Sequence, residues 1–450
     1  MQTLANPNRH LFIDDYWIES MAGVRRRAGV PEKLPTPVMR PEHVWEEPVV
    51  YANTVCFDDQ RGRFEMWYNG YHKRQPDFSR EERVIPCYAT SLDGTHWEKP
   101  TLDLADFRGS TANNIISGGG PGAVLAEPNT GTGVTFRTCR FTGSKARAPD
   151  YGIAAGTSTD GLNWTFDEVN RILPEQGDAT TLYYDACRQK YVVFTRSHDT
   201  IPRSIRGEPF KREIAQSDSD DFVTFSRLRT VLKPEAPDPP DTELYLMVPF
   251  DYGDLHLGLL EVFHTDSATI DIQLTCSRDG TNWERALDRS VIIPLGSDGA
   301  WDSAMIKPSL NPPIRVGDEL WFWYTGLSTP HWQYPMTGAI GVAKLRPDGF
   351  ACLEAGAAGG TVTIRPVPIG GRQLQVNADA VGGELRAGLL TAQGDPVPGF
   401  AIDDCEPLRQ DGLDSALRWR GGDTAPSSQA DVGIVFAMQR ARLYAFEFVE

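Results

Sequence analysis

The stretch SLDGTHW, residues 91–97, decides the fold because the chain repeats it. It returns as STDGLNW at 158–164 and SRDGTNW at 277–283, with weaker copies at 217–225 (SDSDDFVTF) and 344–350 (KLRPDGF). Successive copies lie 67, 61, 58 and 69 residues apart, measured between the turn aspartates Asp93, Asp160, Asp221, Asp279 and Asp348. A period near 60 residues suits a four-stranded antiparallel blade with its loops.

The sequence between these corners predicts strands. Each unit holds runs rich in aromatic and β-branched residues, such as 54–71, 181–196 and 320–326. We find no long segment with the 3.6-residue period of a helix. The Asp-Gly pair supplies a residue that tolerates positive φ at a hairpin corner, and the Trp or Phe that follows can pack beneath it. Five copies therefore predict an all-β fold, a five-bladed β-propeller with a central channel lined by the innermost strands.

The composition changes after Asp348. Residues 351–450 carry Gly-rich turns between short alternating strands, which indicates a β-sandwich of about 100 residues. We therefore expect a propeller over 1–350, with the functional site, and an accessory sandwich over 351–450.

Charge and composition exclude several classes of partner. The chain has 450 residues and a net charge of −17, which argues against nucleic acid and membranes as partners but not against a neutral sugar. No window approaches the roughly 20 apolar residues of a membrane helix. The start shows no signal peptide, so we expect a cytoplasmic protein. The seven cysteines lack metal-binding spacing, and we expect reduced, mostly buried thiols.

Carboxylates stand at or near the start of each predicted innermost strand. Acids that converge on a channel shift one another's pKa and provide what glycosidic bond cleavage requires, namely one proton donor and one base or nucleophile. The same ring could hold a structural Ca²⁺ in the channel, although no cofactor is required. The leading catalytic candidates are Asp178 and Asp302, followed by Asp15, Glu47 and Glu243.

Other polar and aromatic residues fall in the same zone. Histidine and cationic side chains could bind sugar hydroxyls or an acidic sugar, or could serve equally well as structural ion-pair partners. Tryptophans in loops could stack on pyranose rings, although most aromatic residues must fill the blades. The substrate-binding candidates are His264, Arg196, Lys307, Asp241, Trp45, Trp301 and Trp332.

Several segments together resemble a bacterial group described as similar to the N-terminal domain of glycoside hydrolase family 32. They include LFIDDYWIES (11–20), WEEPVVYANTVCFDDQRGRFEMWYNG (45–70), LGLLEVFHTDSATIDIQLTCSRDGTNWER (257–285) and IPLGSDGAWDSAMIKPS (293–309). The resemblance implies the five-bladed propeller clans of families 32, 43, 68 and 130. The nucleophile, RDP and EC phrases of family 32 fructosidases are missing, and Glu406 of DCEP lies in the predicted sandwich. Fructoside hydrolysis is therefore not implied.

The leading hypothesis is an exo-acting glycoside hydrolase that binds an oligosaccharide or glycoside. A non-catalytic carbohydrate-binding propeller is the first alternative. A glycoside phosphorylase is the second, and it would need a basic phosphate pocket, for which Arg196, Lys307 and Arg203 are the candidates. A protein–protein scaffold is a third. The sequence does not indicate the sugar, the linkage, the stereochemical outcome or the oligomeric state.

Overall fold

The computed structural model describes residues 4–72, 75–78, 81–127, 136–143, 151–197, 211–368, 371–426 and 431–450. In these residues the regular structure is β-strand, apart from short 3₁₀ turns, so the predicted all-β class is confirmed. Within the same residues no helix is long and apolar enough to cross a membrane.

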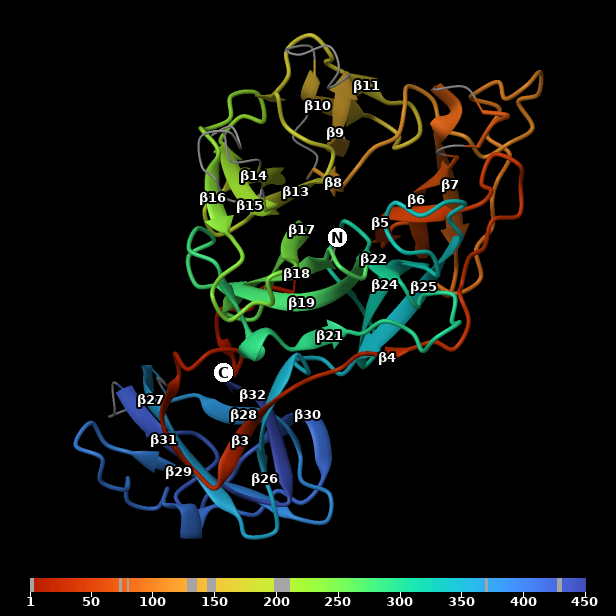
Figure 1. Cartoon of the computed structure of the whole chain (residues 1–450). Coiled ribbons are helices and arrows are strands. Elements are labelled where there is room, and N and C mark those ends of the chain that lie inside the picture. The colour runs from red at the N-terminus through yellow and green to blue at the C-terminus, as the bar shows by residue number, and fades with distance from the viewer. Residues whose placement is uncertain are drawn as a thin grey trace.

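Five groups of antiparallel strands follow one another along most of the chain (Figure 1). The first three groups consist of β5 (Val50–Asp58), β6 (Arg63–Tyr71) and β7 (Val84–Ser91); β8 (Val124–Ala126), β9 (Phe136–Gly143), β10 (Tyr151–Ser158), β11 (Thr165–Phe166) and β12 (Leu173–Pro174); and β13 (Thr180–Asp185), β14 (Lys190–Ser197), β15 (Glu213–Ser219) and β16 (Arg229–Leu232).

The last two groups are joined into one sheet by a single parallel pairing, Ile270 with Met305. They consist of β17 (Thr242–Tyr252), β18 (Leu255–His264), β19 (Thr269–Ser277), β20 (Glu284–Arg285) and β21 (Val291–Ile293); and β22 (Met305–Pro308), β23 (Ile314–Val316), β24 (Glu319–Leu327), β25 (Gly338–Leu345) and β4 (Glu32–Lys33). Strand β4 comes from the N-terminal region, so the fifth group is completed by residues that precede the first. Figure 1 shows the groups arranged around a common centre.

The repeated corner is a hydrogen-bonded turn. In the first copy, the Ser91 hydroxyl accepts from the backbone N–H of Gly94 at 2.8 Å, and Asp93 Oδ1 accepts from the N–H groups of Thr95 and His96, both at 2.8 Å. The corners at 158–163, 219–224 and 277–282 repeat this pattern. The turn residue has positive φ in each, including Phe222 where the Gly is missing.

Tryptophans connect neighbouring groups at these corners. Trp67 of β6 donates to the carbonyl of Gly161 in the second group at 2.6 Å, and Trp323 of β24 donates to that of Gly94 in the first group at 3.1 Å. The corner's own Trp164 also donates to Gly161, at 2.9 Å. The predicted packing of aromatic residues against the corners is therefore present, and it joins the groups laterally.

The fifth copy of the corner differs from the other four. The backbone N–H of Asp348 donates to the Tyr252 hydroxyl at 2.8 Å, and its carboxylate pairs with Arg9 at 2.6 Å. Arg9 also pairs with Glu447 at 2.5 Å. This corner therefore joins the fifth group to the C-terminal strands.

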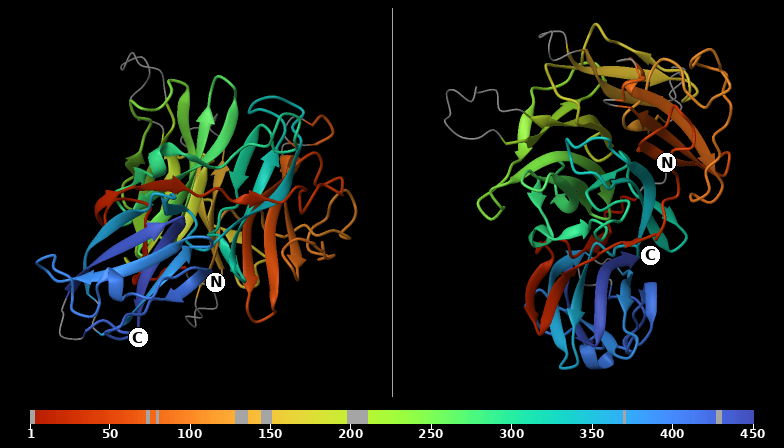
Figure 2. Two further views of the ribbon diagram at one scale, coloured as in Figure 1. Left: turned by 90° about the horizontal axis from the view of Figure 1, so that it is seen from below. Right: turned by 45° about the vertical axis from the view of Figure 1, so that its right-hand side comes forward.

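Two further sheets form the C-terminal part of the molecule, and strands from both ends of the chain contribute to them (Figures 1 and 2). One contains β1 (Arg9–Leu11), β3 (Val24–Ala28), β26 (Ala351–Ala355), β28 (Gln373–Asp379), β30 (Asp411–Ala416) and β32 (Ala441–Val449). The other contains β2 (Ile18–Ala22), β27 (Gly360–Pro368), β29 (Glu384–Leu390) and β31 (Asp431–Gln439).

The sequence placed the whole of 1–350 in one unit. The hydrogen bonding assigns β1, β2 and β3 to the C-terminal sheets, because β1 pairs with β32, β2 with β27 and β3 with β26.

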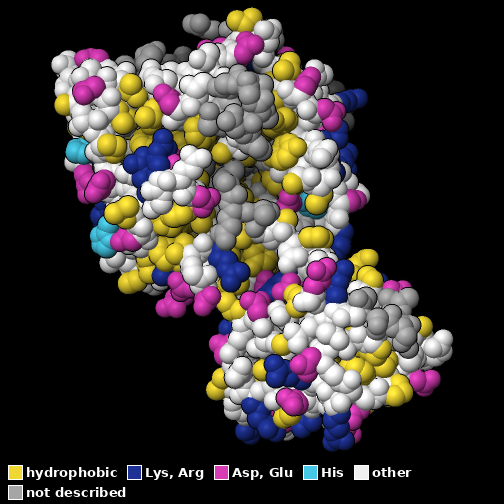
Figure 3. Space-filling model, turned by 180° about the vertical axis from the view of Figure 1, so that it is seen from behind, with side chains coloured by type: hydrophobic (Ala, Val, Ile, Leu, Met, Phe, Trp, Pro, Cys, Tyr) yellow, Lys and Arg dark blue, Asp and Glu magenta, His cyan; other side chains and the backbone are white. Residues whose placement is uncertain are grey.

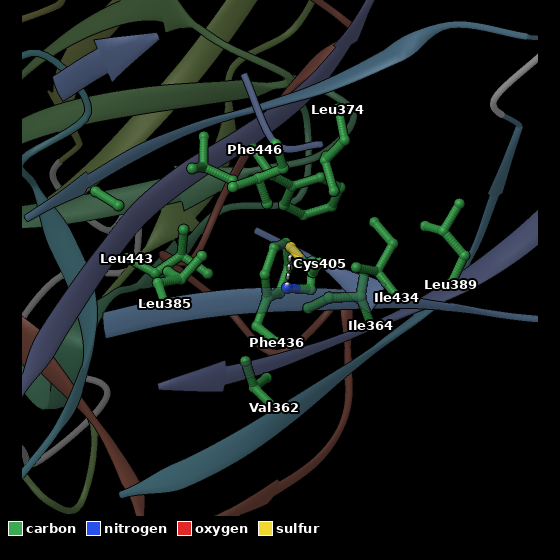
Figure 4. Packing of buried hydrophobic residues seen from close by; sticks show 14 of the residues in the cluster. Val362, Ile364, Leu374, Leu385, Leu389, Cys405, Ile434, Phe436, Leu443 and Phe446 are labelled. Carbon is green, nitrogen blue, oxygen red and sulfur yellow. Dashed lines mark hydrogen bonds between the residues drawn. The ribbon is translucent and has the colours of Figure 1, made fainter. Parts of the chain in front are cut away.

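A buried apolar core lies between these two sheets (Figure 4). Ile364 and Phe436 come from one sheet, Leu374 and Phe446 from the other, and all four are fully buried. The Cys405 thiol lies in this core, where it accepts a hydrogen bond from the backbone N–H of Ala387 at 3.4 Å. Five of the seven cysteines are buried, Cys56 is half-buried and Cys187 is exposed, so the expectation of mostly buried thiols holds.

Candidate active site

The first strand of each group lies against its neighbours. The Thr54 hydroxyl of β5 donates to the carbonyl of Gly122, just before β8, and the Thr181 hydroxyl of β13 donates to that of Met247 in β17. These hydrogen bonds join the first group to the second and the third group to the fourth. Seen from the side opposite Figure 1, the described surface of the larger part carries a mixture of hydrophobic, basic and acidic side chains (Figure 3).

Three ion pairs meet at Tyr245 of β17. Asp178 pairs with Arg196 of β14 at 2.5 Å. Glu243 of β17 pairs with Arg212, and Glu261 of β18 pairs with Lys307 of β22 at 2.5 Å. We call Tyr245 and these six charged residues the Tyr245 cluster.

The three cations of the cluster surround one aromatic ring. Lys307 Nζ lies 4.7 Å from the centroid of the Tyr245 ring, and the guanidinium carbons of Arg196 and Arg212 lie 5.0 and 5.5 Å from it. A cation within about 6 Å of a ring centroid is attracted to the ring. The Tyr245 hydroxyl lies 3.0 Å from His331 Nε2. The third, fourth and fifth strand groups thus contribute to one site.

The carboxylates of the cluster differ in exposure. The Asp178 side chain is 59% exposed and that of Glu243 is 11% exposed, whereas Glu261 is fully buried. Burial raises the pKa of Glu261 above its ordinary value, although Lys307 and Arg196 act in the opposite direction. Asp178 is therefore the most accessible of the three carboxylates, and Glu261 is the buried partner of Lys307.

Trp332 stands beside the cluster with 54% of its surface exposed. Its indole lies 5.7 Å from the Arg212 guanidinium carbon, and its backbone has φ of +70°, a region that non-glycine residues seldom adopt. Backbone strain of this kind is concentrated at functional sites. Trp332 lies in the loop between β24 and β25, and its role in substrate binding stays a prediction.

Asp302 is not a member of the Tyr245 cluster. It is buried, and its carboxylate accepts hydrogen bonds from Lys33 of β4 at 2.7 Å and from the Tyr324 hydroxyl at 3.0 Å. These contacts lie within the fifth group rather than at its meeting point with the third and fourth groups. The predicted pairing of Asp178 with Asp302 therefore has no support in the geometry.

Glu47 and Trp301 lie together in a separate hollow of about 310 Å³. This hollow lies beside the end of β24 and the start of β25, where Ser328 and Thr337 also line it. The structure thus brings together two of the predicted site residues, and no member of the Tyr245 cluster lines this hollow.

The other predicted residues have local structural partners. Asp15 lies between β1 and β2, is exposed and pairs with Arg26 of β3, next to the C-terminal sheets. His264 pairs with Asp271 at 2.8 Å, and this hydrogen bond raises the histidine pKa. The backbone carbonyl of Asp241 accepts a hydrogen bond from the backbone N–H of Thr265.

Trp45 also has local partners. Its ring stacks on His43 with centroids 4.5 Å apart, and its indole N–H donates to Asn114 at 2.9 Å.

No group of three or more His, Cys, Asp or Glu side chains suited to a metal ion occurs in the part of the chain that the structure describes. A structural Ca²⁺ in the channel stays a prediction. Arg203 lies outside the described residues.

Three members of the cluster, Glu261, Tyr245 and Arg212, were not singled out from the sequence. Glu261 left a signal, because it is the one charged residue in the apolar run LGLLEVF at 257–263. A lone carboxylate in a buried strand needs a partner or a function. Tyr245 left no such signal, since it resembles the many aromatic residues that fill strands.

No family model matches the chain, and no curated protein matches it in sequence. Solved structures do resemble it. A glycoside hydrolase aligns with a TM-score of 0.50 at 14% identity over 71% of this chain and 92% of its own, and a complex of BT0996 gives the same values. A structure from the GH130 family of mannoside phosphorylases and glycoside hydrolases aligns with a TM-score of 0.47 at 14% identity over 71% of this chain and 95% of its own.

The first two of these matches show a shared fold. The chain is therefore similar in fold to a solved glycoside hydrolase, in agreement with the resemblance seen in the sequence.

Proposed function

We propose that this protein is a carbohydrate-active enzyme that cleaves glycosidic bonds at the Tyr245 cluster. The observation that carries the proposal is the meeting of three carboxylates, each paired with a cation, around one tyrosine ring in a fold shared with a glycoside hydrolase. Cleavage requires one carboxyl group to protonate the leaving oxygen and a second to act as base or nucleophile. Asp178 and Glu243, the two carboxylates with exposed surface, are the proposed pair.

The residues around this pair fit an exo-acting hydrolase. Arg196 and Arg212 hold the carboxylates in place, and the exposed face of Trp332 offers a stacking surface for a terminal sugar ring. The separation of the two carboxyl groups in a substrate complex would decide the outcome, with about 5 Å for retention and about 6.5–9.5 Å for inversion.

A glycoside phosphorylase is the second candidate because of the three cations. Arg196, Arg212 and Lys307 converge on one ring from different strands, and Arg and Lys are the usual ligands of phosphate. Each cation is already paired with a carboxylate, so a phosphate dianion would leave the cluster with excess negative charge. Hydrolysis is therefore the preferred proposal.

The first prediction concerns turnover. We expect the protein to cleave at least one member of a panel of aryl glycosides and oligosaccharides, tested with and without inorganic phosphate. Asp178→Asn and Glu243→Gln should each lower kcat by about 100-fold or more, the usual contribution of general acid–base catalysis. Turnover that depends on phosphate would select the phosphorylase instead.

The matched control is Asp220→Asn. Asp220 is an exposed aspartate in the same strand group as Asp178, and it pairs with Lys190 as Asp178 pairs with Arg196. Its loss should leave kcat unchanged. If sugars bind to the parent and to both cluster variants equally well and nothing is turned over, the protein is a carbohydrate-binding propeller and not an enzyme.

The five strand groups are the proposed blades of one propeller, and the two C-terminal sheets are the proposed sandwich. In this arrangement residues 32–345 form the ring, and residues 9–28 belong with 351–450.

A further inference from the structure

The hollow beside Trp301 is a second place where side chains gather without an assigned role. Its volume of about 310 Å³ is at the lower end of the range of ligand pockets and suits a single sugar ring. Arg40, Glu47, Ser328 and Thr337 are among its lining residues.

Two glycines allow the indole of Trp301 to lie on the sheet. A Cβ atom at Gly326 of β24 would lie 2.4 Å from Cζ3 of Trp301, and one at Gly341 of β25 would lie 2.6 Å from its Cη2. Neither glycine has positive φ, so these positions need glycine for space and not for backbone conformation. The indole is also stacked on Tyr324, with centroids 5.6 Å apart and planes 17° apart.

Asp302 explains how this arrangement is held. It directly follows Trp301, and its buried carboxylate is fixed by Lys33 and Tyr324. The anchored carboxylate restricts the backbone on which the indole is mounted. A pre-positioned aromatic ring loses little conformational entropy when a ligand stacks on it.

The polar lining of the hollow is balanced in charge. Among the described residues, neither Arg40 nor Glu47 forms an ion pair within 4 Å, although both line the hollow and their charges cancel. The Ser328 and Thr337 hydroxyls lie 2.6 Å apart and retain further hydrogen-bonding capacity. An aromatic ring next to donors and acceptors without net charge matches a neutral sugar, which offers an apolar ring face and a rim of hydroxyl groups.

We propose that the Trp301 hollow is a second carbohydrate site, which binds one neutral pyranose unit by stacking on Trp301 and by hydrogen bonds to Glu47, Arg40 and the Ser328–Thr337 hydroxyl pair. None of its lining residues belongs to the Tyr245 cluster, and binding there does not depend on catalysis. It would hold a distant unit of a longer glycan, or anchor the protein on one.

The test uses the full chain labelled with 5-fluorotryptophan and observed by ¹⁹F NMR. The Trp301 and Trp332 signals are assigned by their loss in Trp301→Phe and Trp332→Phe. We expect at least one of the methyl pyranosides of glucose, galactose, mannose and xylose to shift the Trp301 signal in a saturable manner. Sorbitol, which has hydroxyls but no ring, should not shift it.

Variants of the lining distinguish specific binding from a general effect. Glu47→Gln should weaken the Trp301 response about 10-fold, the effect of losing a hydrogen bond to a charged group, and Thr337→Val should weaken it about 5-fold, the effect of losing a neutral one. Asp178→Asn should leave that response unchanged. The proposal is overturned if no pyranoside shifts the Trp301 signal, if sorbitol shifts it equally, or if both lining variants bind like the parent. The Trp332 signal and the turnover assay report on the Tyr245 cluster independently.

Discussion

Asp279 shows what a single side chain contributes to this fold. Its Oδ1 accepts the backbone N–H groups of Thr281 at 2.8 Å and Asn282 at 2.7 Å, and its Oδ2 accepts the Asn282 side chain at 2.6 Å. Burial acts to raise the pKa of Asp279, but these hydrogen bonds prevail and hold it below its ordinary value. The ionised carboxylate is therefore the form that stabilises the corner.

We predict that Asp279→Ala lowers the free energy of unfolding by about 1 kcal/mol, the usual cost of a lost cap. Asp279→Asn should cost less, because its amide oxygen can still accept. Because the folded pKa is depressed, the contribution of Asp279 is fully present above the unfolded pKa, near 4, and is lost as the pH falls toward the folded pKa. Urea unfolding of the parent and of Asp279→Ala between pH 7 and pH 3 measures this contribution to the free energy of unfolding. If the stability difference between the two proteins does not shrink on acidification, the prediction is contradicted.

At the residue scale the sequence predicted some roles better than others. The corner aspartates repeat, so their structural role could be inferred from spacing alone. Asp178 and Asp302 look alike in sequence, since each stands just before the first strand of its group. They differ in burial and partners, because Asp302 is buried and bonded to Lys33 and Tyr324. These two partners lie 269 and 22 residues from Asp302 along the chain. A pairing between such distant residues has no local sequence signal.

Among the elements, the two-residue strand β4 holds the N-terminal region against the last strand group. It pairs with β25 and so connects the N-terminal region to the last strand group. Lys33 of this strand forms the ion pair with the buried Asp302. A short strand with few backbone hydrogen bonds is thus reinforced by a buried side-chain contact.

We predict that Lys33→Met lowers the free energy of unfolding by about 3 kcal/mol, because it leaves the Asp302 charge buried with one partner fewer. Adding Asp302→Asn should restore part of the loss. The control is Lys344→Met, which removes the more exposed pair with Glu319 in the same sheet and should cost no more than about 1 kcal/mol. Equal losses for Lys33→Met and Lys344→Met in denaturant unfolding would disprove the prediction.

The strands also show where sequence patterns are sufficient. Alternating and aromatic runs predicted strands of each group, and the period of about 60 residues predicted how many groups to expect. The N-terminal strands were assigned to the wrong neighbours because pattern and period describe only local structure. Strand β3, VRRRA, has no repeat partner, and its pairing with β26 is fixed by register with residues more than 320 positions away.

For the whole molecule, the N-terminal strands decide how the C-terminal part is stabilised. Strands β1 and β3 pair with strands of one C-terminal sheet, and β2 pairs with β27 of the other. Phe12 and Ile18, from the same region, lie in the apolar core between the sheets. Neither sheet is complete without residues 9–28.

We predict that a chain lacking residues 1–28 loses protection in its C-terminal sheets, because β26 and β27 each lose a hydrogen-bonded partner. Hydrogen exchange measured by mass spectrometry should show faster exchange over residues 351–450 than over the five strand groups. Adding a synthetic peptide of residues 1–28 should restore slow exchange. Equal exchange in the truncated and full chains would refute the assignment.

This interleaving of the two ends has a consequence for biosynthesis. Strands β1 to β3 must wait for partners that are made more than 300 residues later, and at about 5–20 residues per second the delay is on the order of tens of seconds. During this time β1 to β3 have exposed edges, while the five strand groups encoded between them and their partners can already form. A nascent chain of this protein therefore offers chaperones a segment to shield until the strands that pair with β1 to β3 have been made.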